Sequence, residues 1–317
     1  MNFKSVYVSG LLAVWPVMQG MAQSELIKFG DFDQWIVRNI KESGIIGGDT
    51  KQLYEIGPDA VWNENKAYTN QGGSPWATSN VMAKVCGITK TNTSVYREKR
   101  GDGYCARLDT RMESVKVLGL VNITVLAAGS IFTGSVHEPI KGTKNPQKML
   151  QTGIPFTKKP VALQFDYKVK MSDREKRIRA TGFSKITDVA GKDYPAAILF
   201  LQKRWEDANG NVYAKRIGTL VTYYYHSTDW KNNATYEIMY GDITSRPEYK
   251  PHMMRLQVTE NYTVNSKGES VPIHEVAWGD ENDEPTHLYL QFTSSHGGAY
   301  VGSPGNSLWI DNVKLVY

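Results

Sequence analysis

Residues 302–317, GSPGNSLWIDNVKLVY, decide the fold of this chain. After a Gly- and Pro-bearing loop, apolar side chains stand at Leu308, Ile310, Val313, Leu315 and Tyr317. Alternation at every second residue predicts a strand with one buried face. The alternation changes parity across Asp311 and Asn312, which predicts a β-bulge there. We therefore expect a strand buried in a sheet, with an acid at a break in it.

The same period of two recurs along the chain, in segments rich in aromatic and β-branched residues. These segments are 117–132, 161–171, 197–207, 212–226, 234–243 and 287–296. Asn209-Gly210 predicts a hairpin turn between two of them, because both residues tolerate positive φ. Helical periodicity is weak, and the best helix candidate is residues 31–41. The pattern predicts an all-β fold, a two-sheet antiparallel β-sandwich of jelly-roll type with long loops.

Residues 1–22 read as a secretory signal peptide. Lys4 precedes a mostly apolar run from Ser5 to Met18, and small residues lead to a cleavage site after Ala22. A buried N-terminal helix is the alternative. We expect residues 23–317 to form a single exported domain, periplasmic or extracellular, without a membrane span. No Cys lies near the cleavage site, so we expect no lipoprotein anchor.

Charge and cysteine content exclude some functions. The net charge is +5, and the basic residues are scattered among acids. Nucleic-acid binding would need a concentrated basic stripe, so we expect no nucleic-acid partner. Cys86 and Cys105 are the two cysteines of the chain. In an exported protein such a pair favours a disulfide, with two separate buried thiols as the alternative.

Both ends of the mature chain resemble known β-rich folds. LIKFGDFDQW at 26–35 and LWIDNVKLVY at 308–317 resemble the opening and closing strands of galactose-binding-like jelly rolls. Together with QKRWEDANGNVYAKR at 202–216 and SSHGGAYVG at 294–302, they make the chain similar to the exported bacterial "putative carbohydrate metabolism domain" family. The resemblance implies a jelly roll and a role connected with carbohydrate.

The resemblance to carbohydrate-binding jelly rolls also implies a structural calcium ion. In those folds an acid after the opening Phe and the acid of the closing strand help to hold the ion. The matching positions here are Asp33 and Asp311. Carboxylates suit Ca²⁺, which takes several oxygen ligands. The alternative is that Asp311 only belongs to a bulge and Asp33 only starts a helix. We expect no other cofactor to be required.

Aromatic residues among polar ones are candidates for sugar binding. Trp62, Tyr68 and Trp76 lie in a stretch rich in Asn, Gln, Thr and Ser, and His296 and Tyr300 stand beside glycines. A sugar has apolar C–H faces and polar edges, so its site needs a flat ring and fixed polar groups. The alternative is that Trp62 and Trp76 attach a long loop to the core.

Three functions follow from these observations. The first is a non-catalytic glycan-binding or adhesin-like protein, whose partner is a polysaccharide or other glycan. The second is a hydrolase using two carboxylates on the concave sheet face, for which Glu98, Asp102, Glu206 and Asp207 are available without any preferred pairing. The third is a structural cell-envelope protein with no sugar ligand.

Overall fold

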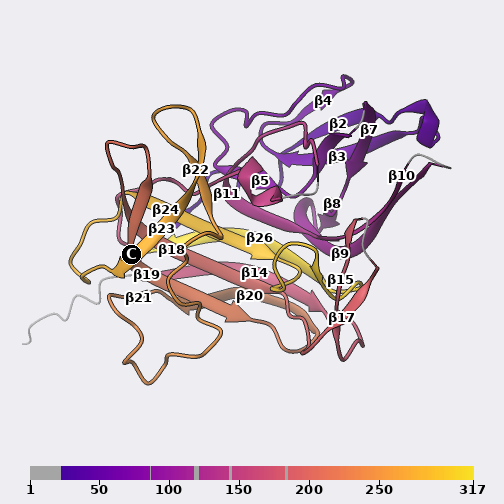
Figure 1. Ribbon diagram of the computed structural model, residues 1–317. Coiled ribbons are helices and arrows are strands. Elements are labelled where there is room, and N and C mark those ends of the chain that lie inside the picture. Colours follow the sequence, from indigo (N-terminus) through magenta and orange to yellow (C-terminus); the bar gives the residue numbers. More distant parts are fainter. Residues whose placement is uncertain (1–22, 86, 118–120, 143–144, 183–184) are drawn as a thin grey trace, which may run out of the picture.

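The computed structural model of the chain describes residues 23–85, 87–117, 121–142, 145–182 and 185–317, with side chains of 115–122 left out. Within these residues the chain forms strands and two short 3₁₀ helices, η1 (Gly44–Ile46) and η2 (Pro146–Met149) (Figure 1). The predicted all-β class is confirmed. The predicted signal peptide, residues 1–22, lies outside the described residues.

The first large sheet has eight strands. Its order is β16-β10-β9-β26-β14-β20, with β1 paired to β26 and β8 paired to β9. The strands are β1 (Ser24–Leu26), β8 (Val95–Arg100), β9 (Gly103–Val117), β10 (Val121–Ala128), β14 (Ala162–Lys170), β16 (Thr181–Gly182), β20 (Thr228–Glu237) and β26 (Ser307–Val316). Every pairing in it is antiparallel.

The second large sheet has ten strands. Its order is β12-β11-β24-β18-β19-β23-β22, with β5 beside β11, β13 beside β24 and β21 beside β19. The strands are β5 (Trp76–Thr78), β11 (Ser130–Val136), β12 (Leu150–Thr152), β13 (Ile154–Pro155), β18 (Ala196–Glu206), β19 (Val212–Tyr223), β21 (Met239–Tyr240), β22 (Tyr262–Val264), β23 (Ser270–Trp278) and β24 (His287–Thr293). Its pairings are antiparallel apart from β19 with β23.

Three smaller sheets extend from these two. They are β2 (Trp35–Lys41) with β3 (Thr50–Ile56) and β4 (Ala60–Trp62), β6 (Val81–Val85) with β7 (Ile88–Asn92), and β15 (Arg177–Arg179) with β17 (Thr187–Val189) and β25 (Val301–Gly302). Residues 31–41, expected to be helical, contain β2 instead. The helix prediction is wrong because Trp35, Ile36 and Val37 are all buried beside β3 and β4.

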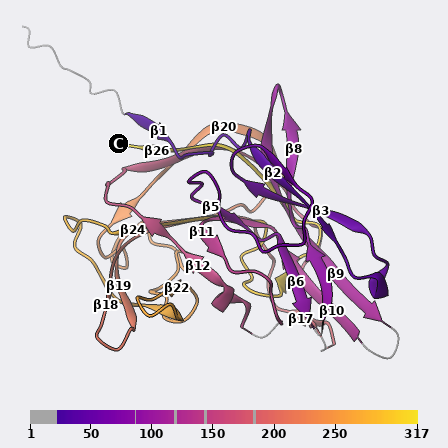
Figure 2. The same cartoon turned by 90° about the horizontal axis from the view of Figure 1, so that it is seen from above.

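The core lies between the two large sheets, which form two layers in Figure 2. Leu163 and Phe165 of β14 and Leu308 and Ile310 of β26 pack with residues of β18 and β24. The rings of Phe165 and Phe292 meet edge to face at 4.8 Å between centroids. The predicted two-sheet sandwich is therefore confirmed.

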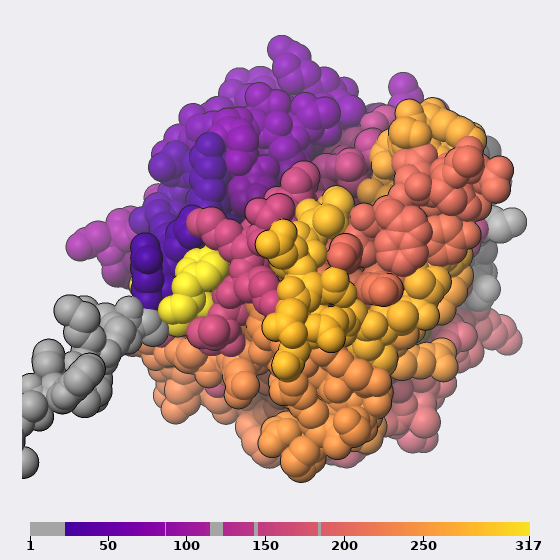
Figure 3. All heavy atoms as spheres, turned by 90° about the vertical axis from the view of Figure 1, so that its left-hand side faces the viewer, coloured from indigo at the N-terminus to yellow at the C-terminus, as the bar shows by residue number. Residues whose placement is uncertain are grey.

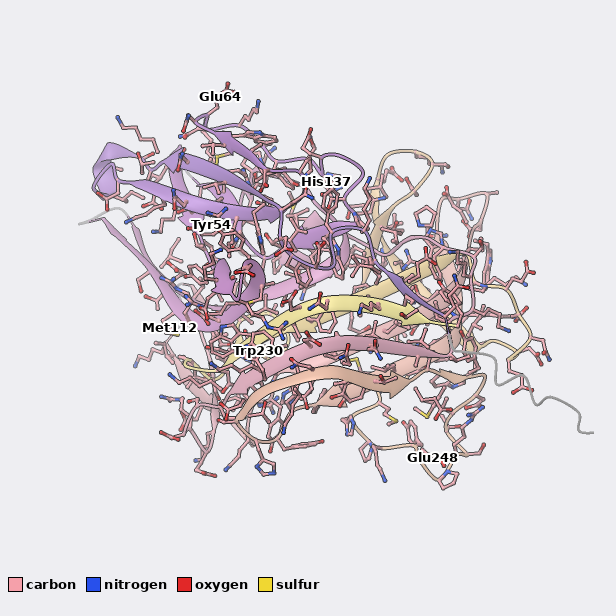
Figure 4. The ribbon with its side chains drawn as sticks, turned by 180° about the vertical axis from the view of Figure 1, so that it is seen from behind. Tyr54, Glu64, Met112, His137, Trp230 and Glu248 are labelled. Atoms are coloured by element: carbon pink, nitrogen blue, oxygen red, sulfur yellow. The ribbon has the colours of Figure 1, made fainter. Side chains whose placement is uncertain are left out.

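Strand β26 lies inside the eight-stranded sheet, between β9 and β14. Its register with β14 shifts between the pairs Gln164–Lys314 and Asp166–Asp311. Asn312 has φ 52°, a left-handed conformation typical of bulges and turns. The predicted bulge is confirmed. The end of β26 pairs with β1, so yellow and indigo spheres lie side by side in Figure 3.

Candidate functional site

A cleft of about 930 Å³ lies on the face of the ten-stranded sheet that points away from the core. Along β18 and β24, alternate residues turn to the two faces, as strand geometry requires. Leu199, Leu290 and Phe292 enter the core between the sheets. The alternate residues Ile198, Phe200, Tyr289, Gln291 and Thr293, together with Ser130 and Phe132 of β11, form the floor of the cleft.

The floor combines aromatic rings with a fixed amide. Phe132 and Ile198 flank Gln291 in register on the neighbouring strands. The hydroxyl of Tyr289 donates to Oε1 of Gln291 at 2.6 Å, which fixes the orientation of this amide. The ring of Phe200 lies 5.9 Å from that of Tyr289. The Nε2 group of Gln291 is thereby presented as a donor beside apolar surface.

One wall of the cleft consists of residues 254–262 and is held from beneath by a buried ion pair. Arg216 and Glu275, both with fully buried side chains, form a short ion pair. Arg216 donates to the carbonyl of Met254 at 2.7 Å, and Glu275 accepts the backbone N–H of Gln257 at 2.6 Å. These bonds fix the backbone of the wall, which presents Gln257, Asn261 and the half-buried ring of Tyr262.

A second wall is the loop from Ser295 to Tyr300, which the buried carboxylate of Asp193 organises. Asp193 accepts the hydroxyl of Ser295 at 2.9 Å and the N–H of Ser303 at 2.8 Å, and also the amide of Asn306. His296 Nδ1 lies 3.2 Å from Asp193 and accepts the N–H of Tyr194 at 2.9 Å. The ends of the neighbouring strands and the carboxylate of Asp193 together hold His296 at the cleft.

The third wall is made by two hairpins, β6–β7 and β9–β10. Their cleft-lining side chains are mostly aliphatic, and the exceptions are Lys90, Thr91, Asn92 and Glu113. Glu113 pairs with Nε of Arg111 at 2.8 Å. Burial nevertheless raises the pKa of Glu113, with the Arg111 charge acting in the opposite direction.

A further carboxylate, that of Glu260, also lines the cleft. It accepts the backbone N–H groups of Val258 and Thr259, both at 2.8 Å. Burial raises the pKa of Glu260, but the backbone hydrogen bonds outweigh it and the net shift is downward. The cleft thus contains two carboxylates whose pKa values are displaced in opposite directions.

The residues predicted from sequence to bind sugar divide into two groups. His296 and Tyr300 line the cleft. Trp76 is completely buried, with Nε1 donating to the carbonyl of Lys28 at 2.9 Å, and Tyr68 is also buried. Trp62 packs on Tyr68 at 5.7 Å and does not line the cleft. The alternative interpretation for Trp62 and Trp76 was attachment of a long loop to the core, and the burial of Trp76 favours it for that residue.

The two predicted calcium ligands have other partners. Asp33 is exposed and accepts the N–H of Tyr104 at 2.8 Å. Arg100 donates to Asp311 at 2.5 Å and to Asp166 at 2.8 Å, so a guanidinium already neutralises the acid of the bulge. Among the described residues no group of three or more His, Cys, Asp or Glu could hold a metal ion. Both acids therefore have partners other than an ion, and the calcium ion stays a prediction from sequence.

The carboxylates considered for hydrolysis lie outside the cleft. Glu98 accepts Nε1 of Trp309 at 2.8 Å and an Arg107 nitrogen at 2.6 Å. Asp102 lies in the β8–β9 turn, while Glu206 and Asp207 lie at the β18–β19 turn, where Gly210 has φ 89° as the predicted hairpin requires. Glu113 and Glu260 were not predicted as site residues, because nothing in their local sequence marks them as sharing a cleft.

One signal in the sequence does point to the floor. In HLYLQFT, residues 287–293, the side chains of Tyr289, Gln291 and Thr293 alternate with apolar ones. Such a polar and aromatic face on a central strand indicates a lined cleft rather than a core.

Cys105 is a buried free thiol and Cys86 lies outside the described residues. Burial raises the pKa of Cys105 to about 12.

Comparison with known proteins adds the following. A family model described as "Putative carbohydrate metabolism domain" matches residues 49–316, most of the chain. No curated protein matches this chain. A solved structure described as a "putative glycoside hydrolase" from Bacteroides thetaiotaomicron is similar at 18% identity and a TM-score of 0.43, covering 84% of this chain and 75% of that one. In the described part of the chain, no helix has the length and apolarity needed to cross a bilayer.

Proposed function

Because the chain belongs to the "putative carbohydrate metabolism domain" family, we propose that it binds a glycan, without cleaving it, in the cleft on the ten-stranded sheet. The glycan lies on the floor formed by Tyr289 and Gln291 and between the walls that carry Tyr262 and His296. We also propose that the chain is exported after removal of residues 1–22, leaving one domain from residue 23 onward.

One observation carries this proposal, the fixed amide of Gln291 beside aromatic surface. Sugar sites pair apolar rings with a few oriented hydrogen-bonding groups, and Gln291 is oriented by Tyr289 at 2.6 Å. The half-buried rings of Tyr262 and Tyr300 stand on two different walls. Both walls are held by buried carboxylates, Glu275 and Asp193, so little ordering is required when a ligand binds.

The test is binding of the full mature chain to a glycan array, followed by titration calorimetry with each glycan that binds. Gln291→Leu removes the amide and keeps the volume, and Tyr262→Ala removes a ring. Each should weaken binding about tenfold, the usual cost of one buried hydrogen bond or ring contact. Trp62→Ala is the matched control outside the cleft and should bind like the wild type. Unaltered binding by Gln291→Leu and Tyr262→Ala would place the glycan elsewhere.

A hydrolase is the second candidate, and the carboxylates of the cleft favour it. Glycosidases use one carboxyl group with a raised pKa and one that stays ionised. The pKa of Glu113 is raised and that of Glu260 is lowered, and both line the cleft. A screen for reducing ends released from each bound glycan tests this. Turnover that disappears in both Glu113→Gln and Glu260→Gln would establish hydrolysis, while binding without release of reducing ends would support the first proposal.

The third function, a structural role in the cell envelope, is favoured by the burial of Trp76 and Tyr68. It predicts that no glycan on the array binds and that Gln291→Leu changes nothing except stability. The same binding experiment therefore separates it from the first proposal.

A further inference from the structure

The lining of the cleft is divided by element into two chemically different halves. The sheet floor and the walls at 254–262 and 295–300 supply amides, hydroxyls and aromatic rings. The two hairpins supply mostly aliphatic side chains, among them Val81, Val85 and Ile88 on one hairpin and Ile123 and Val125 on the other, with Lys90, Thr91, Asn92 and Glu113 as their polar members. The cleft is one continuous volume, so one ligand can contact both halves.

Val81, Val85, Ile88, Ile123 and Val125 are only half buried and do not belong to any of the core clusters of the described residues. Between Val81 and Val85, Met82 packs instead with Ile40 and Leu53. Leu126 of β10 lines the cleft as well, but it is buried against Ile178. Leaving aliphatic surface in contact with water costs free energy in proportion to its area. A ligand that covers these faces recovers that free energy.

A ligand portion that covers the aliphatic part of this half requires no hydrogen bonds. The cleft is lined here by strand faces rather than by open strand edges, and the outer edge of β6 is already paired. The N–H of Lys84 donates to the carbonyl of Ile140 at 2.8 Å, and the N–H of Ile140 donates to that of Met82 at 3.0 Å. A peptide strand would find no free backbone partner at that edge, whereas a hydrocarbon chain needs none.

We propose that the ligand is an amphiphilic saccharide, with its sugar on the floor around Gln291 and an alkyl or acyl chain between the two hairpins. This inference rests on the proposed glycan binding and adds the chemical class of the ligand. From Val81 to Val85 the wall extends about 13 Å along the strand, at roughly 3.3 Å per residue. The hairpins therefore cover a chain of medium length, and each methylene group buried there raises affinity about fourfold.

The test uses alkyl β-glucosides and alkyl β-maltosides with methyl, butyl, hexyl and octyl chains, titrated below their micelle concentrations into the full mature chain. The dissociation constant should fall about fourfold with each added methylene. Octanol, which has the chain without the sugar, should bind at least tenfold more weakly than octyl glycosides. A dissociation constant that does not change with chain length in the wild type would overturn the inference.

Neighbouring residues of β6 supply a matched pair of variants. The side chain of Ala83 lines the cleft, and that of Lys84 is exposed and does not. Ala83→Asp should abolish the dependence of the dissociation constant on chain length, while Lys84→Asp should behave like the wild type. If Ala83→Asp fails to fold, Ala83→Leu replaces it. This variant narrows the space without adding charge and should weaken the binding of octyl glycosides.

The outcomes separate the two proposals. Methyl glycosides or soluble glycans that bind and lose affinity in Gln291→Leu, without any effect of chain length, refute the amphiphile and keep the glycan site. Octanol that binds as well as octyl glycosides, with Gln291→Leu indifferent, refutes the glycan site and leaves an apolar cleft. A fourfold increase in affinity per methylene that needs both Gln291 and Ala83 supports both the glycan site and the amphiphilic ligand.

Discussion

Replacing Arg38 by Met should destabilise the protein strongly, because Arg38 is the only cation of a buried three-residue charge network. Its side chain is fully buried, and the side chains of Glu55 and Glu138 are almost fully buried. Arg38 donates to Glu55 at 2.8 Å, to the two oxygens of Glu138 at 2.5 and 3.2 Å, and to the carbonyl of Lys66 at 3.1 Å. Without Arg38, two carboxylates remain buried together with no counter-charge.

The expected loss follows from this geometry. Breaking one buried ion pair by removing a single partner costs about 3–5 kcal/mol. Two carboxylates lose their partner here, but protonation of one of them limits the cost, since burial already raises the pKa of Glu55 to about 8 against the opposing Arg38 charge. We therefore expect Arg38→Met to lower the free energy of unfolding by about 4 kcal/mol, a large part of the usual 5–15 kcal/mol.

Urea unfolding followed by tryptophan fluorescence measures this change. With an m-value of about 2–3 kcal/mol per molar, the midpoint should fall by about 1.3–2 M. Lys51→Met is the control, because its pair with Asp49 is exposed and should contribute less than about 1 kcal/mol.

A triple variant distinguishes charge from packing. Adding Glu55→Gln and Glu138→Gln to Arg38→Met removes all three charges. Glu138 accepts the N–H groups of Tyr68 and Met82 on its two different oxygens, so Glu138→Gln keeps an acceptor for one of them. The triple variant should regain part of the lost stability. A loss below about 1 kcal/mol in Arg38→Met, or no recovery in the triple variant, would refute this account of the network.

Three further predictions concern other buried polar groups. Asp311→Asn should lower the free energy of unfolding by about 1–3 kcal/mol, because it removes one of the two carboxylates that pair with Arg100. Chelators should leave the melting temperature of the wild type unchanged. A chelator-dependent shift that is lost in Asp311→Asn would show calcium instead. Burial, together with the Arg204 charge, lowers the pKa of His287 to about 4. The free energy of unfolding should therefore fall as the pH drops from about 6.5 to 4, by at most about 1.4 kcal/mol per pH unit. In pH-dependent unfolding, a His287→Gln variant should show a flatter profile. Asp193→Ala should release the loop from Ser295 to Tyr300, measured as faster amide hydrogen exchange there, with unchanged exchange refuting a positioning role.

The fold was largely predictable from the sequence because strand signals are local. A period of two along β18, β24 and β26 marks buried faces, and the parity change at Asp311 located the bulge that the structure contains. The failure at residues 31–41 has the same origin. Consecutive buried residues in β2 lack alternation, because that strand is covered on both faces.

The candidate site was predictable only in part, because most of its residues come together through tertiary structure. The glycines next to His296 and Tyr300 marked a loop that lines the cleft. In contrast, composition alone did not distinguish a buried ring from an exposed one, and Trp76 is in the core. Glu113 and Glu260 lie far apart in sequence and meet the same cleft through separate walls. Partners at such separation leave no local pattern.

The position of β26 also has a consequence for how the chain folds. This strand joins β9 to β14, so the eight-stranded sheet consists of two unconnected parts until residues 307–316 insert between them. Pairing across such long sequence separations requires large loops to close first, which makes folding slow. We expect the insertion of β26 to limit the refolding rate. Until then the two parts expose unpaired strand edges, through which an incomplete chain associates with other copies of itself.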